Sequence, residues 1–325
     1  MSEISNNIVN EPYWGSVTHL VYRGMIVNKD GQLELGTADS VAIGSGIANR
    51  SKMHLSTVVE LVERWGLKLV WGMQDYHENH RVRMMVRKDP KTFLRGLLGM
   101  IKSFEMCEIE IDAVIMSEIL KAPNAVDLLG DSGCCVWLNI GPKGCIGDIQ
   151  RVYSQCFDFL TTVVVKSFGY QSYADVITNH GGLYSLKPSN ESALKHFKSR
   201  TESMDFPCVQ ILMEIDTAGV EYELNPANND IAVGMRVISR KEIYGMMMYG
   251  ELNMVCRYNT DDGWSSINIP GKNTQISYDS EMVVRKKLMH VKEKQMGGVV
   301  IGELQDDLFP THRDSLLTEI SALLG

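Results

Sequence analysis

Short apolar runs alternate with amphipathic stretches along the chain, and this alternation restricts its fold more than any other feature. Runs rich in β-branched and apolar residues predict seven strands: Thr18–Met25, Leu67–Gly72, Cys107–Val114, Cys135–Ile140, Phe159–Val165, Val209–Ile215 and Gly298–Ile301. Apolar residues at helical spacing predict helices between and after them, over Ser51–Trp65, Pro90–Phe104, Ile146–Cys156, Ser192–Ser199, Glu281–Gln295 and Arg313–Leu324. Strands that alternate with helices are typical of parallel sheets. The pattern therefore predicts an α/β fold, and the 325 residues are compatible with one barrel.

The segment 221–277 breaks this alternation. Turn-forming residues cluster at Asn225–Asp230, Asp261–Gly263 and Pro270–Asn273, and strand-like pieces lie between these clusters. We therefore expect a small α+β lobe, inserted late in a barrel domain that covers residues 18–325. Residues 1–17 lack a convincing strand and are expected to form an N-terminal tail.

Charge and hydropathy exclude several classes of function. The net charge of −8 argues against nucleic-acid binding, which requires Lys and Arg gathered on one face. No apolar run approaches the ~18 residues of a membrane-spanning helix. The first residues, MSEISNNIVNEPYW, lack the basic start and apolar core of a secretion signal, so the sequence itself leaves the location unknown.

Seven cysteines are present, an odd number, and none of them has C-x-x-C spacing. This pattern disfavours a zinc site and a complete disulfide framework. Most of the cysteines are expected to be small buried hydrophobic residues. The alternative is one or two disulfides in a secreted form.

The last part of the chain carries the most specific signal, ISYDSEMVVRKKLMHVKEKQMGGVVIGELQDDLFP followed by SLLTEISALL. It resembles the last βα unit of the glycoside hydrolase family 18 chitinases, in which a Tyr-Asp phrase opens a helix and Gly-Gly begins strand eight. THLVYRGMIVNKDGQLEL resembles the second strand of that family and LKLVWG the third. CCVWLNIGP, FDFLTTVVVKSFG and VQILMEIDTAGVEYEL resemble the fifth to seventh. The resemblance implies a TIM (β/α)8-type barrel and a secreted, extracellular protein. The family's first strand has only Asn7–Val9 as a poor counterpart, so the barrel is expected to lack that strand or to fill it poorly.

The catalytic motif of the family, Asp-x-x-Asp-x-Asp-x-Glu on strand four, is degenerate here. The run CEIEIDAV aligns with it and places Cys107, Glu110, Asp112 and Val114 at the four motif positions. In the family the glutamate donates a proton to the leaving glycosidic oxygen, and valine has no ionisable group. The resemblance therefore implies an inactive relative of the chitinases. Glu118 is an alternative, displaced acid that would leave residual hydrolase activity.

Two further positions depart from the family. Val165 and Lys166 stand where a Tyr-Asp pair would orient the substrate acetamide, and Gly302 stands where a tryptophan would form the floor under the sugar. Glu110 and Asp112 are also compatible with a buried polar cluster that stabilises the barrel with a partner such as Lys166. Neither a cofactor nor a metal ion is expected, because no phosphate-binding loop and no metal-ligand spacing are present.

Aromatic residues near strand ends remain able to hold a sugar, because their rings stack on the apolar faces of pyranoses. The candidates are Trp71, Tyr76, Trp137, Tyr170, Tyr222 and Trp264. The sequence thus favours a non-catalytic chitinase-like protein that binds chitin or N-acetylglucosamine oligosaccharides weakly. The alternative is a regulatory scaffold that binds another protein and no sugar.

Overall fold

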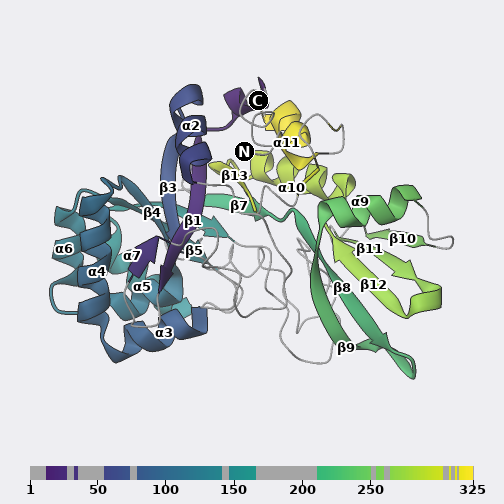
Figure 1. Cartoon of the computed structure of the whole chain (residues 1–325), viewed down its shortest axis with the longest axis horizontal. Helices are drawn as coiled ribbons and strands as arrows, with labels where there is room; N and C mark the ends of the chain where they lie inside the picture. The colour runs from purple at the N-terminus through teal and green to yellow at the C-terminus, as the bar shows by residue number, and fades with distance from the viewer. Residues whose placement is uncertain are drawn as a thin grey trace. The chain divides into compact units, whose positions relative to one another are not determined.

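The computed structural model describes residues 12–27, 33–35, 55–73, 79–140, 146–165, 211–249, 254–259, 264–302, 307–308, 312 and 315–324 (Figure 1). The chain divides into two compact units. The first comprises residues 1–140 and 144–164, and the second comprises residues 141–143 and 165–325. The division of the sequence into a tail of residues 1–17 and a barrel domain of residues 18–325 stays a prediction.

The first unit is built on a largely parallel sheet with strand order β6-β5-β4-β3-β1-β2. Its strands are β1 (His19–Val27), β2 (Leu33–Leu35), β3 (Lys68–Met73), β4 (Glu108–Asp112), β5 (Cys135–Ile140) and β6 (Leu160–Val165). β1, β3, β4 and β5 pair in parallel, whereas β2 folds back antiparallel onto the end of β1. Each of the first five predicted strand runs therefore overlaps a strand of this sheet.

Helices follow the strands, as the alternating pattern predicts. They are α2 (Leu55–Trp65), α3 (Asn79–Lys88), α4 (Pro90–Ser103), α5 (Ala113–Ile119), α6 (Ala125–Asp131) and α7 (Ile146–Cys156). In α4 the apolar stripe is buried and Asp89 caps the first turn, accepting a hydrogen bond from the Thr92 N–H at 3.0 Å. Pro90 fits the first helical position because its fixed φ suits a helix and no N–H is needed there.

The chain before β1 forms the 3-10 helix η1 (Pro12–Ser16), and residues 12–18 contribute no strand. Trp14 of η1 is buried. The predicted counterpart of the family's first strand, Asn7–Val9, lies outside the described residues.

The second unit contains a parallel strand pair and an antiparallel sheet. β7 (Ile211–Ile215) pairs in parallel with β13 (Gly298–Ile301). Helices α10 (Glu281–Glu293) and α11 (Leu316–Leu324) cover this pair, and their apolar side chains form one core with Ile215. The predicted helix Ser192–Ser199 lies outside the described residues.

The antiparallel sheet has strand order β10-β11-β12-β8-β9. Its elements are β8 (Ala218–Asn225), β9 (Asn228–Ser239), α9 (Arg240–Tyr249), β10 (Val255–Asn259), β11 (Trp264–Ile269), η3 (Pro270–Lys272) and β12 (Thr274–Tyr278). A core of isoleucines with Tyr278 joins α9 to one face of this sheet. The α+β lobe that the turn clusters predict is therefore present between β7 and α10.

Candidate functional site

One face of the sheet in the first unit carries polar side chains. Along β4, Glu108, Glu110 and Asp112 alternate with two isoleucines, so the three acids share one face. In the parallel register with β5, Glu110 lies beside Trp137 and Asp112 beside Asn139. Neighbouring residues in register point to the same side, so these two β5 side chains lie on the face of the acids.

Glu110, at the second motif position, is held by an arginine. It is 1% exposed, and Arg23 Nε and Nη2 donate to its two carboxylate oxygens at 2.7 and 2.9 Å. Gly72 of β3 makes room for this pair, because a Cβ there would lie 2.7 Å from Glu110 Oε2 and 2.8 Å from Arg23 Cγ. Arg23 is thus an observed partner for Glu110, whereas the expected partner Lys166 lies outside the described residues.

Asp112, the unchanged motif residue, begins a helix. Its carboxylate accepts hydrogen bonds from the backbone N–H groups of Val114 at 2.9 Å and Ile115 at 3.4 Å, so it is the N-cap of α5. The strand predicted over Cys107–Val114 therefore ends at Asp112, because the cap turns the backbone into a helix. Arg83 of α3 lies 3.8 Å from the same carboxylate.

Val114 lies in the first turn of α5 and is buried. In this position its backbone N–H contacts Asp112, while its side chain is an aliphatic group without a proton to donate. Of the other two residues that the sequence analysis predicts to replace family residues at strand six, Val165 is buried at the end of β6 and Lys166 lies outside the described residues.

Glu118, the alternative acid, forms ion pairs with two basic residues. Arg87 Nε donates to its Oε1 at 3.0 Å, and Lys121 Nζ donates to its Oε2. Burial acts to raise the pKa of Glu118, but the hydrogen bonds from Lys121 and Arg87 outweigh burial and hold the pKa below its usual value. Glu118 is therefore an anion near neutral pH, whereas a general acid must carry a proton.

The aromatic candidates fall into different surroundings. Trp71 is in register with Ile109, on the face away from the acids, and it contacts the rings of Tyr22 and Phe104 with centroids 6.0 and 5.9 Å apart. Trp137 is on the face of the acids, with its ring centroid 4.9 Å from that of His19. Both tryptophans are buried. The structure thus places Trp137, but not Trp71, with Glu110 and Asp112.

The remaining candidates lie in the second unit or outside the described residues. Tyr222 of β8 is buried in a cluster with Val220 and Leu224. Trp264 begins β11, but its side chain is outside the described part of the structure, and so are Tyr76 and Tyr170.

Gly302 follows β13, and its N–H donates to Ile215 O at 2.9 Å. A Cβ at this position would lie 3.5 Å from Asp216 Oδ1, which is an ordinary contact distance. Glu214 and Asp216 alternate with Ile215 and are both buried. Sequence reasoning missed these acids, although the alternation in MEID was the signal that could have indicated them.

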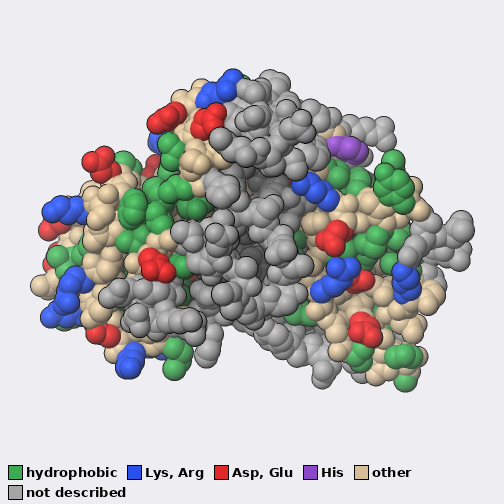
Figure 2. Space-filling view, in the orientation of Figure 1, with side chains coloured by type: hydrophobic (Ala, Val, Ile, Leu, Met, Phe, Trp, Pro, Cys, Tyr) green, Lys and Arg blue, Asp and Glu red, His purple; other side chains and the backbone are tan. Residues whose placement is uncertain are grey.

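The described residues contain neither a metal-binding group nor a membrane-spanning helix. No cluster of three or more His, Cys, Asp or Glu among them is arranged to hold an ion. No helix in the described part of the chain is both long and apolar enough to cross a membrane. On the face shown in Figure 2, acidic and basic side chains are interspersed over the described surface of the first unit.

Comparison with known proteins identifies the fold. No protein-family model matches the sequence, and no curated protein matches it. Among solved structures, a class V chitinase from Nicotiana tobaccum is 14% identical with a TM-score of 0.71, over 99% of this chain and 97% of that one. A chitinase-like agglutinin from Robinia pseudoacacia is 12% identical with a TM-score of 0.70, over 99% and 98%. YKL-39, solved in the presence of chitooligosaccharides, is 12% identical with a TM-score of 0.72, over 100% and 96%.

In each comparison the similarity extends over essentially the full length of both chains. The chain therefore has the fold of the glycoside hydrolase family 18 chitinases and chitinase-like proteins. The predicted fold class, a TIM-barrel type with a late α+β insertion, is confirmed.

Proposed function

We propose that this protein is a non-catalytic chitinase-like protein that binds chitin-type N-acetylglucosamine oligosaccharides on the polar face of the first unit. The observation that carries the proposal is the start of α5. Asp112 caps this helix, and Val114, the residue that the sequence resemblance aligns with the family's proton donor, lies inside its first turn.

The loss of catalysis follows from the protonation chemistry at this place. Hydrolysis of a glycosidic bond requires a protonated group within hydrogen-bonding distance of the leaving oxygen, and one such proton transfer contributes about 10²- to 10⁴-fold to the rate. Val114 has no proton to give, Glu110 is paired with Arg23, and Glu118 is held as an anion by Lys121 and Arg87. These arrangements support a binding role without turnover.

Sugar binding is supported by a buried polar side chain that has an unused hydrogen-bond acceptor. Asn139 is 4% exposed, and its Oδ1 has no hydrogen-bond partner among the described residues. A buried carbonyl oxygen without a donor costs about 1–3 kcal/mol, so an N–H or O–H group of a ligand would be stabilised there. The acetamide of N-acetylglucosamine offers such an N–H, and Trp137 on the same face offers a ring next to it.

The relatives of the fold are compatible with this role, because one is an agglutinin and another was solved with chitooligosaccharides. An extracellular location belongs to the same proposal, since the family that the sequence resembles consists largely of secreted proteins. The alternative is a scaffold for a protein partner, and the binding experiment separates the two.

The test is calorimetric titration with chitotetraose, together with an assay for hydrolysis of a fluorogenic chitobioside. We expect saturable binding with a Kd below about 1 mM and no hydrolysis above the buffer rate. Asn139→Leu should weaken binding by roughly tenfold, because it removes the carbonyl oxygen at similar volume. Thr162→Val, a change on the neighbouring strand β6, is the matched control.

The absence of binding at millimolar oligosaccharide would refute the sugar-binding proposal. Hydrolysis by the wild type would refute the non-catalytic one.

A further inference from the structure

Three cysteines gather where β4 and β5 begin. Cys107 directly precedes β4, Cys134 directly precedes β5, and Cys135 is the first residue of β5. Glu108 and Cys135 are partners in the parallel register, and the Cys135 N–H donates to Cys107 O at 2.8 Å. One residue earlier on each strand, Cys107 and Cys134 therefore lie next to each other.

The three thiols differ in position. Cys135 is the first residue of β5 and shares the face of Glu108 through the parallel register, whereas Cys107 and Cys134 each lie one residue before their strands. Cys107 is exposed, whereas Cys134 is 2% exposed. The pair thus combines a thiol that solvent can reach with a thiol buried next to it.

The thiols are close enough to influence each other's ionisation. Burial raises the pKa of Cys134 to about 12, and Cys135, Cys107 and Glu108 contribute in the same direction. Burial also raises the pKa of Cys135, and Glu108 and Cys107 add to this effect. All three cysteines are free thiols in the structure.

The spacing of the strands is compatible with a disulfide between Cys107 and Cys134. Neighbouring strands lie ~4.8 Å apart, and the Cα atoms of disulfide-bonded cysteines are ~4.4–6.8 Å apart. The two Cβ atoms must approach to ~3.8 Å, which is closer than a regular ladder brings them. The Cys107 carbonyl oxygen accepts from the Cys135 N–H, but Cys107 itself lies in a bend before β4 begins, and this departure from regular strand geometry allows the approach.

We propose that Cys107 and Cys134 form a thiol–disulfide exchange site that a low-molecular-weight disulfide, such as glutathione disulfide, oxidises to an internal disulfide. The Cys107 thiolate attacks one sulfur of the small disulfide, its S–S bond breaks, and one small thiol leaves with a proton. Cys134 then loses its proton to solvent and attacks the Cys107 sulfur, which releases the second small thiol. Two protein thiols are oxidised, and one small disulfide is reduced to two thiols.

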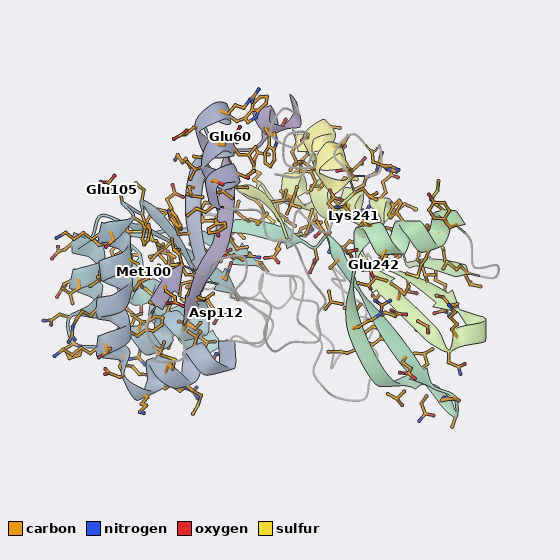
Figure 3. All side chains as sticks on the ribbon, in the orientation of Figure 1. Glu60, Met100, Glu105, Asp112, Lys241 and Glu242 are labelled. Carbon is orange, nitrogen blue, oxygen red and sulfur yellow. The ribbon has the colours of Figure 1, made fainter. Side chains whose placement is uncertain are left out.

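The disulfide would link β4 and β5 at the ends opposite to Asp112 and Asn139. In Figure 3, Glu105 and Asp112 lie at opposite ends of β4, and Cys107 follows Glu105 in the chain by two residues. Oxidation would therefore link the N-terminal ends of β4 and β5 covalently. The disulfide itself would not contact Asp112 or Asn139 at the other ends of these strands. The inference stands on the cysteines alone and does not require the proposed sugar binding.

The test is incubation of the full chain with glutathione disulfide at pH 8.5, followed by tryptic digestion without reduction and mass spectrometry. Cleavage after Lys102, Lys121 and Lys143 puts Cys107 in one peptide and Cys134 with Cys135 in the next. We expect the two peptides to be linked in the wild type and in Cys135→Ser, and separate in Cys107→Ser. The melting temperature should rise by roughly 5 °C on oxidation and return after dithiothreitol.

Two outcomes would overturn the inference. A link that persists in Cys134→Ala would mean that Cys135 is the partner. Glutathione that remains on Cys107 without an internal link would mean that the two sulfurs do not meet in the folded protein. Circular dichroism of Cys107→Ser serves as the folding control, because this exposed residue tolerates serine.

Discussion

Arg23 of β1 and Glu110 of β4 form a two-pronged ion pair across β3, in the space that Gly72 leaves open. Removal of the guanidinium leaves a buried carboxylate without its charge partner, which is more costly than loss of the whole pair. We expect Arg23→Met to lower the free energy of unfolding by about 3 kcal/mol in urea titrations. The double variant Arg23→Met, Glu110→Leu should recover most of this loss. Equal losses in the single and double variants would contradict the argument.

Lys287 of α10 and Asp279 form an ion pair that is 1% and 0% exposed, with Nζ 2.5 Å from Oδ2. The same reasoning predicts that Lys287→Met destabilises the protein by about 3 kcal/mol. Lys286→Met, one position earlier on a less buried part of the helix, should cost less than about 1 kcal/mol. The comparison is made by thermal and urea unfolding, and similar losses in both variants would speak against the pair.

Ser239 and Glu242 cap the N-terminus of α9 by hydrogen bonds between the side chain of each and the backbone N–H of the other. The Ser239 N–H donates to Glu242 Oε2 at 2.9 Å, and the Glu242 N–H donates to Ser239 Oγ at 3.2 Å. This is a capping box, so Ser239→Ala should cost about 1 kcal/mol of unfolding free energy. Ser239→Asp retains an acceptor for the Glu242 N–H and is expected to lose less. An unchanged free energy of unfolding in Ser239→Ala would show that α9 does not depend on this cap.

The lowered pKa of Glu118 predicts that the protein loses stability in acid. Burial opposes its ionisation, but hydrogen bonds from Lys121 and Arg87 lower its pKa below the usual 4.5. A carboxyl whose pKa is lower in the folded than in the unfolded state stabilises the fold above the unfolded value, and this contribution disappears as the pH falls through the folded value. We expect Glu118→Gln to cost about 1 kcal/mol at pH 7 and to flatten the decline of stability below pH 4.5. An unchanged pH profile in this variant would assign the acid sensitivity to other groups.

Val114→Glu tests whether a carboxyl group at this one position can act as a proton donor. The residue is buried in the first turn of α5, where the helix directs its side chain into the packing of the unit. We expect the variant to be less stable than the wild type and to release no fluorophore from a chitobioside above the buffer rate. Hydrolysis by this variant would mean that the strand-four site keeps the family's catalytic geometry despite the helix.

The order of the main strands and of several longer helices can be predicted from the sequence, because the periods of apolar residues are local properties of the chain. The five N-terminal strand runs overlap β1 and β3 to β6, and the turn clusters mark the α+β lobe between β7 and α10. The sequence also sets the chemistry of single positions, since the aliphatic side chain of Val114 has no proton to donate wherever the chain places it. The short helices α3, α5 and α6 were not predicted, because their apolar patterns are too brief to separate from loops.

Which side chains meet depends on long-range packing that no local pattern of residues reveals. Arg23 and Glu110 are 87 residues apart in the chain, and no local pattern connects them. The end of β4 at Asp112 depends on a carboxylate that turns back to two N–H groups, which alternation of apolar residues does not reveal. Cys107 and Cys134 likewise become neighbours only through the register of β4 with β5, because strand pairing is a long-range interaction that the sequence leaves open.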